Sequence, residues 1–401
     1  MSVLSGKKIL LGISGGIAAY KTPLIVRLFN SAGAEVKVVM TPAAKDFVTP
    51  LTLSTLSNHP VVSNFTDESH DNPVWNDHVA LGKWADVFLI APATSNTLSA
   101  MVHGKCNNLL IATYLSCNCP VYIAPAMDLD MYAHPANQEN LRRLEAIGKK
   151  VLPVAEGFLA SGLHGKGRML EPEEIVNFLS NDLLSRLPLF GKKVLITAGP
   201  TYEPIDPVRF IGNHSSGKMG YALAEQAHIL GAEVILISGP SAEAVSSHIL
   251  LKKVTTSEQM YQCVMDHFST ADIAIAAAAV ADFKPEAVAD QKIKKEKGLN
   301  TIPLVPTRDI LAKMGKLKKK QYLVGFALET ENEQANALQK LSSKNLDAIV
   351  LNSLNEPGAG FSGDENKVTF IDNKNNTVPF ELKSKTQVAQ DIFSQILLRY
   401  A

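Results

Sequence analysis

KILLGISGGIAAYK, the sequence from Lys8 to Lys21, contains the pattern on which the fold prediction depends. The apolar run Lys8–Ser14 predicts a buried parallel strand, its glycines predict a tight loop, and apolar residues at helical spacing over Gly16–Ala32 predict a helix. This alternation continues along the chain, which predicts a doubly wound parallel sheet. The next strands are predicted at Glu35–Met40, Asp86–Ala91 and Pro120–Ala124, and the next helices at Pro42–Ser57, Ser95–His103 and Glu139–Ile147.

The same pattern starts again in the second half of the chain. Gly191–Lys193 followed by VLITAGP resembles Gly6–Lys8 followed by ILLGISG, and Pro188 interrupts the segment between the halves. We therefore predict an α/β protein of two doubly wound domains, residues 1–189 and 190–401. The elements predicted here are strands at Lys193–Thr197, Glu233–Ser238, Asp272–Ala278, Tyr322–Ala327 and Asp347–Asn352, helices at Met219–Leu230, Glu258–Phe268, Ile310–Met314 and Asn332–Lys344, a hairpin of Lys367–Ile371 with Thr377–Glu381, and a last helix capped by Ser384.

The composition is typical of a globular protein that acts on small molecules. The 401 residues are 46% hydrophobic and 19% charged, so the chain can bury a sizeable core. Its 39 Lys and Arg balance 39 Asp and Glu, which argues against nucleic acid or an anionic membrane as a partner. The sequence has no apolar run of membrane length and no signal-peptide pattern at Met1–Lys8, so we expect a cytoplasmic location. The four cysteines are too few for a disulfide scaffold and lack zinc-ligand spacing, and no metal ligands can be assigned.

Three loops of the first half follow predicted strands, where open α/β sheets bind ligands. Gly12, Gly15 and Gly16 let backbone N–H groups approach a phosphate at the N-terminus of the next helix, and Ser14 adds a hydroxyl. The other two loops are Pro92–Thr97, which reads PATSNT, and Pro125–Tyr132, which reads PAMDLDMY.

These two loops resemble the PASANT and PAMNxxMW motifs of the homo-oligomeric, flavin-containing cysteine decarboxylases. The resemblance implies a flavodoxin-like flavoprotein domain in residues 1–189, with trimer contacts around each flavin. It also implies that His78 is the active-site histidine and that bound FMN supports redox-assisted decarboxylation of a cysteinyl substrate. The implied FMN contacts are Ser14, Gly15, Ser95, Asn96 and Thr97, with Met127 nearby.

The chain departs from this family at two positions. Asp128 replaces the motif asparagine that contacts the substrate carboxylate, and a second anion there repels that carboxylate unless it is protonated or turned away. Ser161 replaces the proton-donating cysteine, in a Gly-rich segment that reads LASGLHGKGRM over Leu159–Met169. A serine hydroxyl is too weak an acid to take over this role near neutral pH. We hypothesise that His164 donates the proton instead; the alternative is that His164 only lies on the surface of this segment.

The most specific motif of the second half lies between Ile196 and Gly220. Gly199 permits close backbone approach, Ser215–Gly217 form an N–H-rich entry to the predicted helix, and Arg209 can bind an anion. The segments ITAGPT, EPIDPVR and NHSSGKMG resemble, nearly residue for residue, the motif of the phosphopantothenate-cysteine ligases. Over nearly its whole length, the chain thus resembles the bifunctional decarboxylase and ligase family of coenzyme A biosynthesis.

The resemblance implies a Rossmann-like ligase domain in residues 190–401. Such a domain uses CTP and Mg²⁺ to activate 4′-phosphopantothenate as an acyl-cytidylate and joins it to cysteine, and the flavin half converts the product to 4′-phosphopantetheine. Asn213 would hold the reacting carboxylate or the acyl-cytidylate, Lys292 matches the catalytic lysine, and Arg308 replaces the proline common in its segment. The implied nucleotide contacts are Ala276, Ala277, Ala278, Asp282, Lys292, Arg308, Asp309, Ile310, Phe326, Lys340 and Lys344.

Two other interpretations remain open. In the first, the ligase is active, but Asp128 and Ser161 leave a flavin-binding half that lacks full decarboxylation or reduction of the enethiol. In the second, the chain is a flavoprotein that acts as a regulatory partner. The resemblance also implies a homo-oligomer in which ligase dimers join decarboxylase trimers into a dodecamer.

Overall fold

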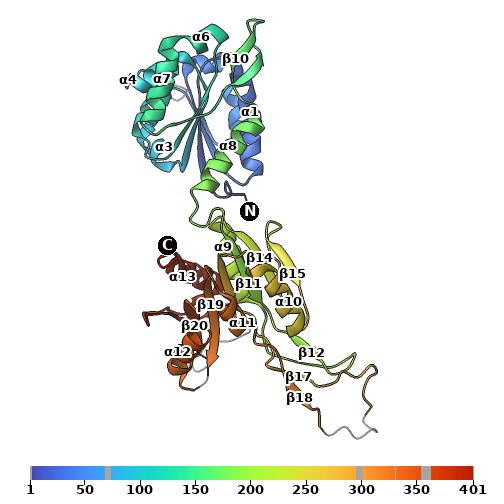
Figure 1. The fold of residues 1–401 in the computed structure, drawn as a ribbon. Helices are drawn as coiled ribbons and strands as arrows, with labels where there is room; N and C mark the ends of the chain where they lie inside the picture. The colour runs from blue at the N-terminus through green and yellow to red at the C-terminus, as the bar shows by residue number, and fades with distance from the viewer. Residues whose placement is uncertain (1, 68–73, 295–300, 330, 354–362, 401) are drawn as a thin grey trace. The chain divides into compact units, whose positions relative to one another are not determined.

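The computed structural model describes residues 2–67, 74–294, 301–329, 331–353 and 363–400, and the chain divides into two compact units (Figure 1). The first unit is Ser2–Leu184, and the second begins at Ser185. This division falls at the end of α8 (Pro172–Ser185), shortly before the boundary predicted between residues 189 and 190. Each unit contains a mostly parallel sheet of its own, which confirms the predicted class of two doubly wound α/β domains.

The sheet of the first unit is parallel, with the strand order β3-β2-β1-β6-β7-β8. When these six strands are numbered by their order in the chain, the sheet order is 3-2-1-4-5-6, as in dinucleotide-binding sheets. Flavodoxin has the order 2-1-3-4-5. The first unit is therefore doubly wound, as predicted, with the strand order of a dinucleotide-binding sheet. The topological switch point lies between β1 and β6. The strands are β1 (Lys8–Ile13), β2 (Glu35–Met40), β3 (Val61–Val62), β6 (Val87–Ala93), β7 (Val121–Pro125) and β8 (Lys150–Val151).

Helices cover both faces of this sheet (Figure 1). Successive side chains of β1 point to opposite faces, so that Ile9 and Leu11 join one core and Leu10 joins the other. Burial on both faces explains why the strands are continuous apolar runs. The first core is covered by α1 (Thr22–Ser31), α2 (Pro50–Ser57) and α8, and the second by α4 (Ser95–His103), α5 (Leu109–Ser116) and α7 (Pro135–Ala146).

The remaining elements of the first unit are short and mostly follow the ends of the sheet strands. The Gly-rich segment after β8 forms an antiparallel hairpin, which the sequence analysis had not predicted. These elements are η1 (Ile17–Lys21), η2 (Pro42–Asp46), β4 (Thr66–Asp67), β5 (Val74–Trp75), α3 (His78–Trp84), α6 (Leu129–Ala133), β9 (Ala155–Phe158) and β10 (His164–Arg168).

The sheet of the second unit repeats this topology and extends it. Its order is β15-β14-β11-β16-β19-β20-β22-β23. The first six strands are parallel, β22 pairs antiparallel with β20, and β23 pairs antiparallel with β22. The pair β22 and β23 confirms the predicted hairpin. The strands are β11 (Lys193–Ala198), β14 (Glu233–Ser238), β15 (Leu250–Lys253), β16 (Ile273–Ala276), β19 (Tyr322–Glu329), β20 (Ala348–Ser353), β22 (Val368–Asp372) and β23 (Thr377–Pro379).

Among the described residues, two helices cover one face of the second sheet and three cover the other. The last helix begins with a capping box, in which Ser384 and Gln387 bond to each other's backbone N–H groups, as predicted for Ser384. The first face carries α9 (Lys218–Ile229) and α13 (Lys385–Leu397), and the second carries α10 (Ser257–Phe268), α11 (Ile310–Leu317) and α12 (Glu333–Ser343).

Short antiparallel pairs complete the second unit. The segment with β12, β17 and β18 projects away from the body of this unit (Figure 1). The pairs are β12 (Tyr202–Pro204) with β13 (Phe210–Gly212), β17 (Phe283–Pro285) with β18 (Leu304–Pro306), and β21 (Glu365–Asn366) with β24 (Lys383–Ser384).

Candidate active sites in the two units

Ser14 links the two loops at the switch point of the first unit. Its Oγ donates a hydrogen bond to the carbonyl of Pro92 (2.7 Å) and accepts one from the N–H of Thr94 (3.1 Å). The side chain is buried, and Thr94 Oγ1 lies 3.2 Å from Thr97 Oγ1. The Ser14 hydroxyl therefore holds the loops after β1 and β6 together.

Gly15 and Gly16 lie where the backbone passes close to neighbouring segments. A Cβ at Gly15 would stand 2.8 Å from Ala43 Cβ and 2.9 Å from the Ala43 backbone, and one at Gly16 would stand 3.2 Å from Thr94 Cγ2. Contacts below 3 Å to backbone require the structure to move. Gly15 thus needs to be glycine, and Gly15 and Gly16 leave a surface formed by backbone at the end of β1.

The first turn of α4 offers backbone N–H groups next to this surface. Its N-cap, Thr94, makes no side-chain capping bond. Ser95 Oγ donates to Asn137 Oδ1 (2.7 Å), Asn96 is exposed and Thr97 is buried. An uncapped helix N-terminus beside a glycine loop can accept a phosphate group.

The loop after β7 packs against the β9–β10 hairpin. Met127 N donates to the carbonyl of Gly167 (3.0 Å), and a Cβ at Gly167 would stand 2.4 Å from Met127 O. Asp128 caps α6 by accepting from Leu129 N (2.7 Å), so one of its carboxylate oxygens has a structural role. The hairpin is also anchored by the buried Lys21, whose Nζ donates to Met169 O (2.9 Å).

The two candidate histidines of this unit occupy different elements. His78 is the first residue of α3, makes edge contacts with the rings of Phe65 and Trp75, and has a buried Nδ1 without a hydrogen-bond partner among the described residues. His164 is exposed at the start of β10 and packs edge-on against Phe158, with the ring centroids 5.2 Å apart. In the part of the chain that the structure describes, no hydrogen bond joins either histidine to Asp128.

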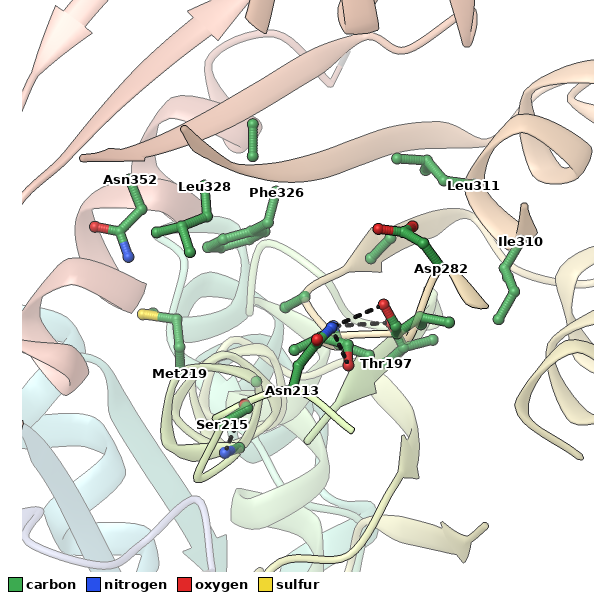
Figure 2. A pocket seen from close by; sticks show the side chains of 18 of the residues that line it. Thr197, Asn213, Ser215, Met219, Asp282, Ile310, Leu311, Phe326, Leu328 and Asn352 are labelled. Carbon is green, nitrogen blue, oxygen red and sulfur yellow. Dashed lines mark hydrogen bonds between the residues drawn. The ribbon is translucent and has the colours of Figure 1, made fainter. Parts of the chain in front are cut away.

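The second unit contains a cavity of about 870 Å³ at the carboxyl ends of its parallel strands (Figure 2). It brings together segments that are far apart in the sequence. Of the residues predicted in this unit, the cavity is lined by Asn213, Ala276, Ala277, Ala278, Asp282, Arg308, Asp309, Ile310, Phe326, Lys340 and Lys344.

The N-terminus of α9 forms one wall of this cavity. Its N-cap, Gly217, has a φ of +83° and lies against the backbone of Gly199, while a Cβ at Gly220 would stand 2.5 Å from Ala198 Cβ. The glycines therefore bring α9 close to β11. Asn213 lies in the middle of the lining in Figure 2, and its Nδ2 donates to the carbonyls of Ala279 (3.3 Å) and Val280 (3.0 Å).

Two predicted lysine ligands of the cavity are paired with carboxylates. Lys340 Nζ lies 2.6 Å from Glu329 Oε1, and Lys344 Nζ lies 2.8 Å from Asp309 Oδ2. Burial alone would raise the pKa of Asp309, but hydrogen bonds from Lys344 and from the first turn of α11 outweigh it and lower that pKa. Because such ion pairs at a partly exposed site are weak, an incoming phosphate can replace the carboxylates.

Arg308 and Lys292 are placed differently from the other predicted ligands. Arg308 lines the cavity, but its guanidinium pairs with Glu258 (3.3 Å) and lies 4.9 Å from the ring centre of Tyr261 on α10. Lys292 is exposed and is not among the cavity-lining residues.

The segment that carries Lys292 is fixed to the loop between β12 and β13. Arg209 Nη2 donates to the carbonyl of Ile293 (2.8 Å), and Ile293 N donates to Asp206 Oδ2 (3.2 Å). Arg209 also forms an ion pair with Asp206, and its hydrogen bond holds the pKa of Asp206 far below the usual range. The sequence suggested that Arg209 binds the anion of a ligand. In the structure, its anion partner is the Asp206 carboxylate.

Several cavity residues were not identified from the sequence. Lys218 lies within the quoted motif, where its charge could have signalled an anion site. The others lie on elements with no glycine-rich or basic pattern, so only the fold brings them to the cavity. They are Thr307, Leu328, Asn352, Asn366 and Lys385.

The described residues provide neither a metal-ligand cluster nor a membrane-spanning helix. Among these residues, no group of three or more His, Cys, Asp or Glu side chains is arranged to hold a metal ion. Within the same ranges, no helix has the length and apolar character needed to cross a bilayer.

Comparisons with known proteins match both units. Residues 2–184 match the family described as Flavoprotein, and residues 189–399 match the DNA/pantothenate metabolism flavoprotein C-terminal domain. A cysteine/cysteine sulfinic acid decarboxylase from an unknown prokaryotic organism is 53% identical over 356 residues, which cover 87% of this chain and 99% of the relative. The coenzyme A biosynthesis bifunctional protein CoaBC of Bacillus subtilis (strain 168) is 44% identical over 397 residues, 98% of this chain and 97% of the relative. The crystal structure of the C-terminal domain of a CoaBC protein is 41% identical, covers 53% of this chain and 97% of that domain, and has a TM-score of 0.46.

Proposed function

This chain belongs to the two-domain family of pantothenate-metabolism flavoproteins that includes the CoaBC bifunctional proteins, and from that premise we propose that it joins 4′-phosphopantothenate to cysteine and decarboxylates the product. The observation that carries the proposal is the cavity of the second unit, in which Asn213 lies among the residues implied for a nucleotide. The two alternatives, a flavin module without decarboxylation and a regulatory flavoprotein, are not favoured by these relatives.

The ligase half has to make an unreactive carboxylate susceptible to an amine. CTP is the proposed activating substrate: attack of the carboxylate on the α-phosphorus forms an acyl-cytidylate and releases pyrophosphate, and the amine of cysteine then displaces CMP. Asn213, held by the carbonyls of Ala279 and Val280, would position the carboxylate. Lys340 and Lys344 would exchange their carboxylate partners for phosphate oxygens and, with Lys292, neutralise the developing charge.

Mg²⁺ fits this site as a companion of the nucleotide. In nucleotide sites, this ion is bound mostly by phosphate oxygens and water, with one or two protein carboxylates. Asp282 in the cavity lining is a carboxylate of that kind.

The first unit has the features that FMN requires. The backbone surface at Gly15 and the uncapped start of α4 at Ser95, Asn96 and Thr97 suit a phosphate, and the buried, unpaired Nδ1 of His78 suits a polar ligand. Bound FMN would supply the two-electron chemistry that makes loss of CO₂ possible. Ser14 would keep the two loops in place, and Met127 lies on the third loop.

Asp128 and His164 would act on the substrate and its proton. The Asp128 carboxylate caps α6 with one oxygen, and its second oxygen can face a ligand. Gly165, the residue after His164, packs on Leu129, which follows Asp128, whereas the exposed His164 ring packs on Phe158. We propose that His164 supplies the proton that Ser161 cannot.

A second candidate function for the flavin half is decarboxylation of free cysteine or cysteine sulfinic acid, the activities in the name of the 53% identical relative. Asp128 favours this candidate, since a carboxylate complements the α-ammonium group of a free amino acid, whereas phosphopantothenoylcysteine carries a neutral amide at that nitrogen.

One set of incubations tests both candidates. The purified protein is given 4′-phosphopantothenate, cysteine, CTP and Mg²⁺, or cysteine or cysteine sulfinic acid alone, and every product is identified by mass spectrometry. We expect 4′-phosphopantetheine only in the complete mixture, with CMP and pyrophosphate. CO₂ release from the free amino acids without CTP would favour the second candidate, and an unchanged complete mixture would refute the first.

The last part of the proposal concerns the location and the assembly of the enzyme. We propose a cytoplasmic enzyme that acts as a homo-oligomer, with flavin-domain trimers and ligase-domain dimers joined into a dodecamer. The mass of the native protein, measured by light scattering, tests this assembly.

A further inference from the structure

The cavity of the ligase unit has a second polar end, at which Phe326 is the one implied nucleotide contact that Figure 2 labels. In Figure 2, Asp282, Ile310 and Leu311 lie to one side of Asn213, and Met219, Leu328 and Asn352 lie to the other. Lys218, which precedes Met219 and begins α9, also lines the cavity, as does Lys385, the first residue of α13. Lys218 pairs with Asp364, and Lys385 donates to the carbonyl of the neighbouring Gly363. Two lysines from different helices therefore reach this end of the cavity.

Lys385 is an unusual cation because it is almost completely buried. Only 7% of Lys385 is exposed, and its Nζ donates to the carbonyl of Gly363 (2.6 Å). Burial and the nearby charge of Lys218 lower the pKa of Lys385, against the opposite effect of Asp364 and Glu243. A bound anion would therefore relieve the mutual repulsion of Lys218 and Lys385.

The acid partner of Lys218 is easily replaced. Lys218 Nζ lies 2.5 Å from Asp364 Oδ1, but 85% of the Asp364 side chain is exposed to solvent. An exposed carboxylate loses little when it returns to water. A phosphate monoester carries a charge of about −1.5 to −2 at pH 7 and offers three acceptor oxygens, so it is a stronger partner for two lysines.

A neutral polar atom lies on the same side of the cavity. The Oδ1 atom of Asn352 is buried and has no hydrogen-bond partner among the described residues. A buried acceptor of this kind is costly unless a ligand or water donates to it. The acid substrate has a hydroxyl and an amide N–H between its phosphate and its carboxylate, and either can donate to Asn352.

We propose that Lys218 and Lys385 bind the 4′-phosphate of the acid substrate. The substrate then extends past Asn352 to Asn213, where its carboxylate meets the nucleotide held on the Asp282 and Ile310 side. This inference rests on the proposed function and names the part of the site that selects the phosphorylated acid. The nucleotide triphosphate offers the same chemistry, but Lys340 and Lys344 already lie among its implied contacts, so we assign the second end to the acid.

The test compares Lys385→Gln and Lys218→Gln with the wild-type protein. We expect each variant to raise KM for 4′-phosphopantothenate about 10-fold to 100-fold, the effect of losing one charged hydrogen bond, and to leave KM for CTP within about twofold. Pantothenate, which lacks the phosphate, should be used equally poorly by the wild type and both variants. Titration calorimetry of 4′-phosphopantothenate without CTP should show the same loss of affinity.

Lys383→Gln is the matched control. Lys383 is two residues from Lys385 and pairs with Asp391 at 2.8 Å, but it is not a cavity-lining residue, so its KM values should equal those of the wild type. If Lys385→Gln does not fold, Lys218→Gln decides alone, because that side chain is 32% exposed.

Other outcomes overturn the inference. A rise in KM for CTP alone would assign these lysines to the triphosphate, and unchanged KM values for both substrates would remove them from the site. If the wild type forms no phosphopantothenoylcysteine, this result contradicts the proposed ligase function. The calorimetric titration then still decides this inference, since the binding of 4′-phosphopantothenate either depends on Lys218 and Lys385 or does not.

Discussion

At the scale of single residues, we predict that replacing Gly15 by alanine reduces both stability and FMN binding. An alanine here would place its Cβ 2.8 Å from Ala43 Cβ and 2.9 Å from the Ala43 backbone, so the loop after β1 has to shift. We expect Gly15→Ala to lower the free energy of unfolding of the first unit by about 1–3 kcal/mol, as overpacking does. Because the shifted loop is part of the proposed phosphate surface, the purified variant should also retain little FMN, measured by flavin absorbance per protein.

Gly157→Ala is the control for this prediction. The nearest atom to a Cβ at Gly157 is Arg168 Nη1 at 3.4 Å, an ordinary contact with a flexible side chain. This variant should therefore keep both its stability and its FMN. Full FMN content in Gly15→Ala would contradict the role of the glycine loop.

The sequence identifies the types of residue at the sites better than their partners. From motif positions, Asn213 was assigned to the reacting carboxylate or acyl-cytidylate and Asp282 and Phe326 to the nucleotide, and the cavity brings all three together. The ion pairs of Lys340 and Lys344 could not be predicted, because Glu329 and Asp309 reach them only through the fold. Arg209 differs, because its anion partner is Asp206, a carboxylate three residues earlier in the same turn.

At the scale of elements, Asp372 ties the β22–β23 hairpin to Arg399, which follows the end of α13. Its carboxylate accepts from Arg399 Nε (2.7 Å), from Asn376 Nδ2 (2.9 Å) and from the backbone N–H of Lys374 (2.9 Å). Burial acts to raise the pKa of Asp372, but the hydrogen bonds from Arg399, Asn376 and the backbone outweigh it and lower that pKa to about 2. The carboxylate is thus bound in its ionised form.

This pKa predicts an acid-dependent loss of stability. A carboxyl group whose pKa is lower in the folded chain stabilises the fold above its unfolded pKa of about 3.9, and the stabilisation disappears as the pH falls toward 2. Between pH 5 and pH 2, the wild type should therefore lose about 2 kcal/mol more free energy of unfolding than Asp372→Asn, measured by urea denaturation of the second unit. Equal losses in the two proteins would show that this carboxyl is not coupled to folding.

The long elements were predictable and the short ones were not. The apolar run of β14 and the capping signal of α13 have the lengths and residue types on which periodicity depends, and the structure confirms both. β3 and β8 have two residues each, too few for a pattern. The β9–β10 hairpin was missed because its Gly-rich sequence lacks an alternating apolar pattern.

At the scale of the whole molecule, each hydrophobic core belongs to one unit. Within the ranges that the structure describes, two cores contain only residues of the first unit, and two contain only residues of the second. Leu189 joins a core of the second unit, and Leu187 packs against Gly231, so the second unit already begins before the predicted boundary. Pro188 indicated an interruption in the sequence, but it could not show on which side these leucines pack.

Because each unit has its own cores, we predict that both activities are retained when the two units are cleaved apart. A protease site inserted between Ser185 and Leu187 leaves both sets of core residues intact, so after cleavage each unit should keep its own cooperative unfolding transition. We expect FMN to remain with the piece that contains β1 and α4, and CTP-dependent formation of phosphopantothenoylcysteine to remain with the piece that contains α9. The uncut protein with the same insertion is the control. Loss of ligation on cutting, with both transitions retained, would mean that the ligase site needs a residue from the flavin half.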